Sequence, residues 1–304
     1  MYVYIRLTEK CNLNCEHCFN NIRTNKIIDF DKLKVVLTNL NKRFNNNIFI
    51  IHGGEPLLVN TKDIIKLIND FPNNKWQITT NLIYDLTDDM ISLFKLINIL
   101  RISFDIKIRF NNFRNLHTWV KNIKILKQNN IDINLNLCLT KYLINHSISS
   151  FINFINRLDT KTYRLEILRY HGNVNCKSQF VINNNQIDDW IFDLYKYDKT
   201  DNRCINIQEI KHCINSKNSF YKTCCNNTLT INSDLSIGNC PAYTSNNSKL
   251  LLDEILHNHR KIRNECLICD YYQYCRGWCN KMNWTNNICP FPKKLANEIL
   301  EGMK

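Results

Sequence analysis

Three cysteines near the start of this 304-residue chain, Cys11, Cys15 and Cys18, carry its strongest chemical signal. They directly follow an apolar stretch that predicts a strand over residues 2–7, so three thiolates share one short loop. Three thiolates can bind three irons of a four-iron–four-sulfur cluster and leave the fourth iron open for chemistry. Zinc is the competing interpretation, since a zinc knuckle also uses closely spaced cysteines.

Other residues able to bind a ligand follow the later predicted strands. In the run Gly53, Gly54, Glu55 and Pro56, the glycines let the backbone pass close to a ligand, and the carboxylate can accept hydrogen bonds from an ammonium group. Further candidates at strand ends are Thr79, Thr80, Asn81, Ser103, Asp105, Asn136, Arg164, Glu166 and Arg169. For the last four, a strand-end cap or a solvated loop is an equally good interpretation.

Ten of the fifteen cysteines lie between residues 204 and 289, in a region that is poor in apolar periodicity. Such a region needs a metal to hold it together, so these cysteines are expected to be ligands of iron–sulfur clusters or of zinc. Cys138, in contrast, lies in an apolar strand and is expected in the core. His17 and His52 are expected to be packing or hydrogen-bonding residues.

These motifs together resemble the radical S-adenosylmethionine (SAM) superfamily. The resemblance implies that the amino and carboxylate groups of SAM chelate the free iron, that Phe19 lies near the adenine, and that Gly53–Pro56 binds the methionine amino group. It also implies that the other strand-end residues bind the SAM carboxylate and ribose: Thr80, Asn81, Ser103, Asp105 and Asn136.

The C-terminal cysteines resemble the SPASM domain of radical SAM maturases, which implies two auxiliary four-iron–four-sulfur clusters and three clusters in all. The outer cluster would use Cys266, Cys269, Cys275 and Cys289. The inner cluster would use Cys225, Cys240 and Cys279, with Cys213 or Cys224 as a fourth ligand, or an open iron in its place.

Six strands are predicted over the first two thirds of the chain, at residues 2–7, 48–52, 76–80, 99–104, 133–139 and 163–168. They alternate with predicted amphipathic helices such as 31–44, 61–70, 87–96, 116–128 and 147–158. This alternation predicts an α/β fold whose parallel sheet closes into a partial (βα)6 TIM-like barrel, with the chemistry at the carboxyl ends of the strands. We expect the barrel over residues 1–195. A small cysteine-rich SPASM domain with a C-terminal helix is expected over residues 196–304.

The composition narrows the location and the partners. Fifteen cysteines without a secretory signal point to the reducing cytoplasm, and no apolar run is long enough to cross a membrane. The formal net charge is +13, but the lysines and arginines are scattered, so we expect no nucleic-acid partner. The same positive field would attract an acidic peptide substrate.

The resemblance implies a 5′-deoxyadenosyl radical that removes a hydrogen atom from a ribosomally made peptide, leading to a thioether or carbon–carbon crosslink. Epimerisation is the alternative within the class; it needs a thiol hydrogen donor, for which Cys204, Cys213 and Cys224 are candidates. A separate leader-binding protein and a reductant such as flavodoxin or ferredoxin are the expected partners. An iron–sulfur electron carrier and a zinc-ribbon nucleic-acid binder remain alternatives from other classes.

Overall fold

The computed structural model describes residues 1–20, 24–110, 112–168, 172–174, 178–215, 227–238, 240–241, 263–275, 284 and 288–303. Cys224, Cys225, Cys279 and Arg169 lie outside these ranges. What the sequence predicts for them therefore stays a prediction.

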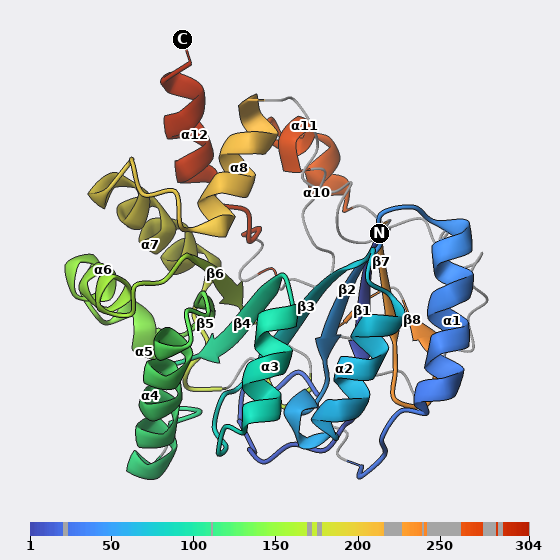
Figure 1. The fold of residues 1–304 in the computed structure, drawn as a ribbon. Coiled ribbons are helices and arrows are strands. Elements are labelled where there is room, and N and C mark those ends of the chain that lie inside the picture. The colour runs from blue at the N-terminus through green and yellow to red at the C-terminus, as the bar shows by residue number, and fades with distance from the viewer. Residues whose placement is uncertain are drawn as a thin grey trace.

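One sheet runs through the molecule, with strand order β6-β5-β4-β3-β2-β1-β7-β8 in the described residues (Figure 1). Its strands are β1 (Tyr2–Arg6), β2 (Ile48–His52), β3 (Lys75–Thr80), β4 (Ile99–Phe104), β5 (Asn134–Leu139), β6 (Thr162–Ile167), β7 (Thr228–Ile231) and β8 (Ile237–Gly238). All neighbouring strands pair in parallel except β7 and β8, which form an antiparallel hairpin. The parallel α/β sheet predicted from the alternation is confirmed.

Helices between β1 and β6 connect these strands and cover the apolar face of the sheet (Figure 1). The helices in the described residues are α1 (Phe30–Arg43), η1 (Pro56–Leu58), α2 (Thr61–Asp70), α3 (Asp88–Leu96), α4 (Phe113–Gln128), α5 (Lys141–Ile144), α6 (Ile148–Arg157), α7 (Asn184–Tyr197), α8 (Ile205–Asn215), α10 (Asn264–Leu267), α11 (Tyr272–Cys275) and α12 (Lys293–Glu301). Side-chain oxygens of N-cap residues fix where several of them begin, as Asp29 does for α1 and Ser147 for α6.

The two faces of the sheet differ in polarity because side chains alternate along each strand. One register row that faces the helices joins Ile5, Ile51, Ile78 and Leu100, all at most 3% exposed. Rows on the opposite, inner face are polar: Arg6 with His52, Thr79 with Arg101, Ser103 with Asn136 and Arg164, and Cys138 with Glu166. The inner face of the partial barrel therefore presents polar side chains that could bind a ligand.

The outer edge of β6 is closed by helix α8. The side-chain amide of Asn206 accepts from the Leu165 backbone N–H at 2.7 Å and donates to the Leu165 carbonyl at 3.1 Å, as a neighbouring strand would. Glu209, one turn further on, forms a bidentate ion pair with Arg164 at 2.5 and 3.2 Å. These contacts satisfy backbone groups that an open edge would expose.

The chain beyond residue 195 contributes to the barrel as well as to a separate group of helices. Strand β7 pairs along β1, so the sheet continues across the predicted domain boundary. Helices α8, α10, α11 and α12 gather at one end of the molecule (Figure 1), where α12 packs on α7 and α8 and α11 packs on α8.

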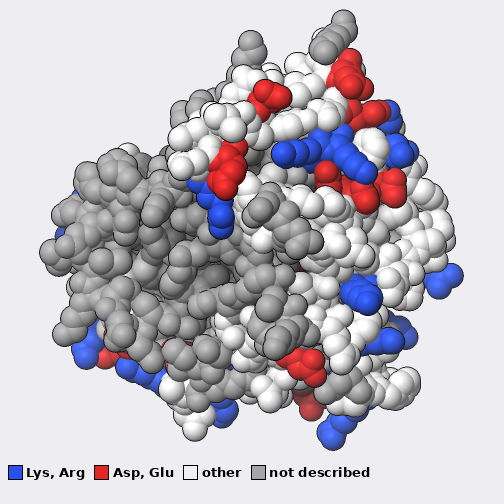
Figure 2. All heavy atoms as spheres, turned by 180° about the vertical axis from the view of Figure 1, so that it is seen from behind, with Lys and Arg blue, Asp and Glu red and all other residues white. Residues whose placement is uncertain are grey.

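Charged side chains of both signs share the surface. On the face shown in Figure 2, the described lysines and arginines lie beside aspartates and glutamates. In the described part of the chain, no helix is long and apolar enough to span a membrane.

Candidate active site

The loop with Cys11, Cys15 and Cys18 leaves β1 at its carboxyl end, as the sequence predicts. The Cys18 backbone N–H donates to the Cys15 carbonyl at 3.1 Å, and the Cys11 sulfur accepts from the Leu13 N–H at 3.4 Å. The three thiols lie close enough to influence one another electrostatically, and burial raises the pKa of Cys11 to about 11. Metal binding must therefore displace protons from this loop, which an iron–sulfur cluster does.

The Gly-Gly-Glu-Pro loop lies directly against the segment that leads into the cysteine loop. Gly54 N–H donates to the Thr8 carbonyl and Glu55 N–H to the Lys10 carbonyl, each at 2.8 Å. A Cβ on Gly53 would lie 2.3 Å from the Thr8 oxygen, and one on Gly54 would lie 2.2 Å from the Lys10 oxygen. Glycine is required at both positions because backbone occupies the space of any side chain.

Glu55 ties this loop to the end of β3. Its carboxylate, 1% exposed, accepts from the Thr80 hydroxyl at 2.7 Å, the Asn81 N–H at 2.8 Å and the Leu57 N–H at 3.3 Å. Burial raises the pKa of Glu55 to about 7, although these hydrogen bonds oppose the rise. Burial therefore destabilises the ionised form of Glu55, and a cationic ligand beside the carboxylate would stabilise that form.

Asn81 makes the next link to the cysteine loop. Its side chain donates to the Asn12 side-chain oxygen at 2.8 Å and accepts from the Ile83 N–H at 2.8 Å, while Asn12 donates to the Ile83 carbonyl at 2.5 Å. The polar atoms of Thr80 and Asn81 thus hold three loops together. Their predicted contacts with SAM remain a proposal.

Arg109 is a site residue that the sequence analysis missed. Its backbone N–H donates to Asp105 Oδ1 at 2.6 Å, and its Nε lies 3.6 Å from Asp105 Oδ2. Arg109 is 9% exposed, and its guanidinium lies near enough to the Cys15 thiol for the two to influence each other electrostatically. Burial by itself would lower the pKa of Arg109, but the charges of Asp105 and Cys15 raise it. The side chain is a permanent cation next to a predicted cluster ligand.

His17 completes this buried group from within the cysteine loop. Its Nε2 lies 3.5 Å from Asp105 Oδ2 and 3.4 Å from Arg109 Nη2. Burial lowers the pKa of His17 to about 4, because the opposing effect of Asp105 is too small to offset it. The imidazole is therefore neutral at pH 7.

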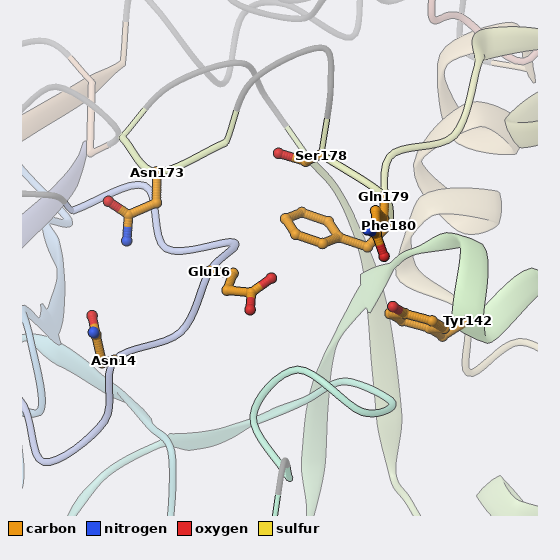
Figure 3. A pocket seen from close by; sticks show the side chains of 7 residues that line it. All are labelled: Asn14, Glu16, Tyr142, Asn173, Ser178, Gln179 and Phe180. Atoms are coloured by element: carbon orange, nitrogen blue, oxygen red, sulfur yellow. The ribbon is translucent and has the colours of Figure 1, made fainter.

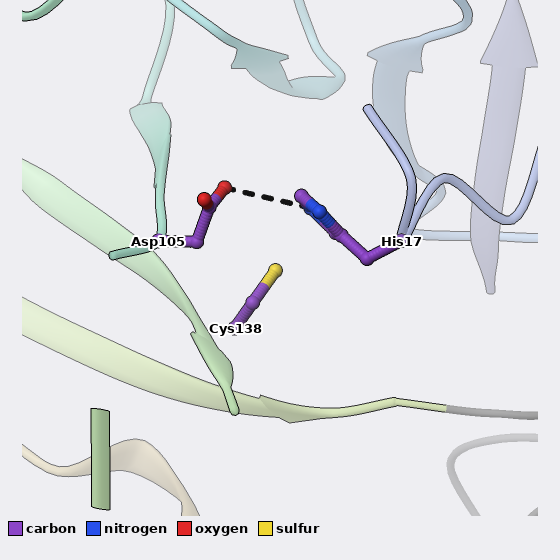
Figure 4. Close-up of side chains that lie close together, drawn as sticks. All are labelled: His17, Asp105 and Cys138. Atoms are coloured by element: carbon purple, nitrogen blue, oxygen red, sulfur yellow. Dashed lines mark ion pairs between the residues drawn. The ribbon is translucent and has the colours of Figure 1, made fainter. Parts of the chain in front are cut away.

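Cys138 lies beside this group and not in the apolar core, which corrects the expectation from its strand (Figure 4). Among the described residues, His17, Asp105 and Cys138 are the only three potential ligands whose atoms lie within 4.8 Å of one another. A metal ion does not suit this position, because the Arg109 guanidinium already neutralises Asp105 and would repel a second cation.

Several buried polar atoms around the inner face have no hydrogen-bond partner within the described residues. They include His17 Nδ1, Arg109 Nη1, Asn136 Oδ1 and the Nε and Nη1 of Arg6. Unpartnered buried groups are costly unless a ligand satisfies them, so these residues and the three cysteines fit a site for a cluster and a polar cofactor such as SAM.

Arg6, another residue that the sequence analysis missed, connects this site to the C-terminal cysteines. It is fully buried at the end of β1 and donates from Nη2 to the Pro241 carbonyl at 3.1 Å. Pro241 follows Cys240, a predicted auxiliary-cluster ligand, in the chain.

A pocket of about 500 Å³ opens beside the cysteine loop (Figure 3). Glu16 points into it from the loop, opposite Phe180, while Tyr142 lies at the start of α5. Asn173 forms another wall, donating from its backbone to the Cys18 carbonyl at 2.9 Å and from its side chain to the Cys15 carbonyl at 3.2 Å. A molecule in this pocket would lie against the loop of the predicted cluster ligands.

The other residues predicted to bind SAM or to donate hydrogen do not form one group. Phe19 is 37% exposed at the end of the cysteine loop, and Ser103 and Asn136 are neighbours on the inner face. Cys204 is fully buried beside Tyr163, near the amino end of β6 and so at the opposite end of the barrel from the cysteine loop. Cys213 is buried on α8.

The described C-terminal cysteines are grouped in short helices and turns. Cys266 and Cys275, both 7% exposed, lie on α10 and α11, and the Cys269 N–H donates to the Cys266 carbonyl at 3.2 Å. Cys289 packs against the hydrophobic core.

Comparison with known proteins agrees with this geometry. Residues 5–155 match the Radical SAM superfamily, and the protein is a radical SAM enzyme. Members of this family use SAM and a four-iron–four-sulfur cluster. The uncharacterized protein MJ0907 of Methanocaldococcus jannaschii is 33% identical over 75 residues, which are 25% of this chain and 26% of that protein. The match thus spans about a quarter of this curated relative.

Two solved structures share the fold over nearly the whole chain. One is anSMEcpe with bound AdoMet and the Cp18Cys peptide, which has a TM-score of 0.79 and 15% identity and covers 99% of this chain and 95% of its own. The other is Streptococcus suis SuiB bound to precursor peptide SuiA, with a TM-score of 0.66, 16% identity and coverage of 95% and 76%. These similarities confirm the partial TIM-like barrel.

Proposed function

We propose that this radical SAM enzyme is a peptide maturase that acts on a ribosomally made peptide and forms a thioether or carbon–carbon crosslink. The observation that carries the proposal is the cysteine loop at the carboxyl ends of the parallel strands, hydrogen-bonded to the Gly-Gly-Glu-Pro loop. In this proposal Cys11, Cys15 and Cys18 hold the N-terminal cluster.

SAM would lie on the inner face, held by the residues that the sequence predicts. Gly53, Gly54 and Glu55 would face its methionine amino group, and Ser103 and Asn136 lie near enough on adjacent strands to share one ligand. When bound, the reduced cluster and SAM supply a 5′-deoxyadenosyl radical that removes a hydrogen atom from an unactivated C–H bond. The buried walls exclude water and stray hydrogen donors from that radical.

A peptide substrate is supported by three observations. The pocket beside the cysteine loop has the size of a typical ligand site. The C-terminal cysteines have the spacing of a SPASM domain. Both structures of similar fold were solved with peptides, Cp18Cys and SuiA. A separate leader-binding protein and a flavodoxin or ferredoxin reductant in the cytoplasm complete the proposal.

Two auxiliary clusters would accept the second electron of an oxidative reaction. A crosslink removes two electrons from the substrate, and hydrogen-atom removal accounts for only one of them. Cys266, Cys269, Cys275 and Cys289 would hold the outer cluster, and Cys240 would bind the inner cluster with cysteines outside the described residues.

Epimerisation is the second candidate, and one observation favours it. It is redox-neutral and needs a thiol beside the substrate radical. Cys204 lies at the far end of the barrel, whereas Cys138 lies beside His17 at the site. Cys138 is thus better placed as the hydrogen donor than Cys204.

Iron and SAM cleavage test the central claim. Anaerobically prepared protein should hold about twelve irons, the content of three four-iron clusters. Replacing Cys11, Cys15 and Cys18 together by Ala should remove about four irons and abolish SAM cleavage, while the remaining iron stays. Zinc in place of iron, or SAM cleavage by the triple variant, would contradict the proposal. Retained clusters without SAM cleavage in the wild type would favour an electron carrier.

Product mass separates the two reactions. A crosslink lowers the mass of the peptide by two hydrogens per event, whereas epimerisation in heavy water leaves the bonding unchanged and adds one deuterium. Replacing Cys266, Cys269 and Cys275 should stop a crosslink but leave SAM cleavage measurable. Replacing Cys138 by Ala should instead stop epimerisation. Deuterium incorporation without loss of hydrogens would exclude the crosslink.

A further inference from the structure

Arg109 lies between the predicted cluster ligands and a carboxylate that fixes its position. Asp105 holds it at two points, at the backbone N–H at 2.6 Å and at Nε at 3.6 Å. Asp105 is itself 1% exposed, so water does not compete for the pair. A guanidinium held in this way cannot turn freely toward another partner.

The free side of the guanidinium faces the cysteine loop. Nη2 lies 3.4 Å from Nε2 of His17, which directly precedes Cys18, and Nη1 is buried without a partner within the described residues. The guanidinium also lies near enough to Cys15 for its charge to favour the thiolate and lower the pKa of that thiol, against the larger effect of burial. Nη1 can therefore still donate a hydrogen bond. A sulfur of a cluster bound by these cysteines would be a suitable acceptor.

An iron–sulfur cluster gains one negative charge when it is reduced. Its reduction potential depends on nearby charge, on hydrogen bonds to its sulfurs and on solvent exposure. A buried cation is little screened by salt and stabilises the more negative, reduced state. Arg109 supplies such a charge, and its unpartnered Nη1 is a donor still free to form a hydrogen bond.

We propose that Arg109, fixed by Asp105, is a positioning residue that donates a hydrogen bond to the Cys15 sulfur of the N-terminal cluster and makes this cluster easier to reduce. The inference rests on the proposed function, in which Cys15 is a cluster ligand. No bond forms or breaks in this role. The external reductant supplies the electron, and Arg109 shifts the equilibrium of that transfer.

The experiment is a redox titration of the full-length protein followed by electron paramagnetic resonance. The signal of the N-terminal cluster is the one missing from the Cys11, Cys15 and Cys18 triple variant. In Arg109→Met this signal should titrate at lower potential than in wild type, with the reduced-to-oxidised ratio at a fixed potential lower by about tenfold. Arg109→Lys, which keeps the charge but not the planar donor, should lie between the two.

Arg114→Met is the matched control, because Arg114 is exposed on α4 and its loss changes the net charge equally. Full iron content with an unchanged midpoint potential in Arg109→Met would overturn the proposal. Weaker SAM binding at an unchanged potential would also overturn it, because it would show that Arg109 acts on SAM and not on the cluster. If Arg109→Met does not retain the cluster, Arg109→Lys decides: a lower potential supports the proposal and the wild-type potential overturns it. Failure of the proposed function would appear separately, as wild-type protein without the signal.

Discussion

Glu55 offers the sharpest test of how SAM is recognised. Its carboxylate is buried, and burial raises its pKa to about 7. Thr80 and Asn81 already donate to its two oxygens. If the SAM ammonium approaches as well, the opposite charge favours the ionised form and the pKa of Glu55 falls.

The size of this effect follows from the pKa. At pH 7 about half of the Glu55 side chains carry a proton, so an ammonium partner should release up to about half a proton per SAM bound. This release should decline as the pH rises above 8. Glu55→Gln cannot release a proton, and it loses a charge-assisted hydrogen bond of about 1.5–3 kcal/mol. The affinity for SAM should then fall roughly ten- to a hundredfold.

Calorimetric titration of the anaerobic, cluster-loaded protein with SAM measures both quantities, if it is repeated in two buffers with different ionisation enthalpies. Iron content should be the same in wild type and Glu55→Gln. Glu9→Gln is the matched control: it removes a nearby carboxylate that is hydrogen-bonded to Thr24, outside the contacts of Glu55. Wild-type affinity and proton release in Glu55→Gln would refute the reasoning and show that Glu55 only links two loops.

Three further predictions concern the same framework. As the pH rises from 4.5 to about 7, the free energy of unfolding of the wild type should fall by about 3 kcal/mol relative to that of Glu55→Gln. The reason is that the Glu55 carboxyl ionises over this range in the unfolded chain but stays protonated when buried. Denaturant titrations of both proteins across this pH range would measure the difference. Gly54→Ala should lose the iron of the N-terminal cluster, because its Cβ would meet the Lys10 oxygen at 2.2 Å, whereas Gly238→Ala, with nothing within 4 Å, should keep full iron content. Trp119→Ala should cost about 3–5 kcal/mol of stability, since its ring is buried against Phe104, and Val120→Ala, 40% exposed on the same helix, should change the thermal midpoint little.

The barrel could be predicted from the sequence because each strand carries its own signal. Residues that face the helices are apolar at every second position, and the helices repeat apolar residues at their own spacing. The predicted strands agree with the structure to within one residue at most ends. Helix α7 was missed, although Ile187, Trp190, Ile191 and Leu194 follow a helical period behind the Asn183 capping box.

The site was predictable only where it is local in sequence. The cysteine loop and the Gly-Gly-Glu-Pro run each carry several functional groups within a few residues. Arg109 and His17 meet although they are 92 residues apart, and a single Arg or Cys in a strand or loop has no spacing that could reveal its partner. Gly172 is a similar case: a Cβ there would lie 2.4 Å from the Phe19 carbonyl, a contact that only the fold creates.

The N-terminal cysteines and the C-terminal cysteines differ in how their surrounding structure is stabilised. The N-terminal loop rests on a sheet with a large core and is held by hydrogen bonds among backbone groups of Thr8, Lys10, Gly54 and Glu55 that need no metal. Two of the described C-terminal cysteines, Cys266 and Cys275, lie on α10 and α11, helices of four residues that are too short to be stable by themselves. It follows that the barrel can position Cys11, Cys15 and Cys18 before iron arrives, whereas α10 and α11 depend on the ligands of their cysteines for stability. Iron loss should therefore disturb α10 and α11 first and leave the barrel folded.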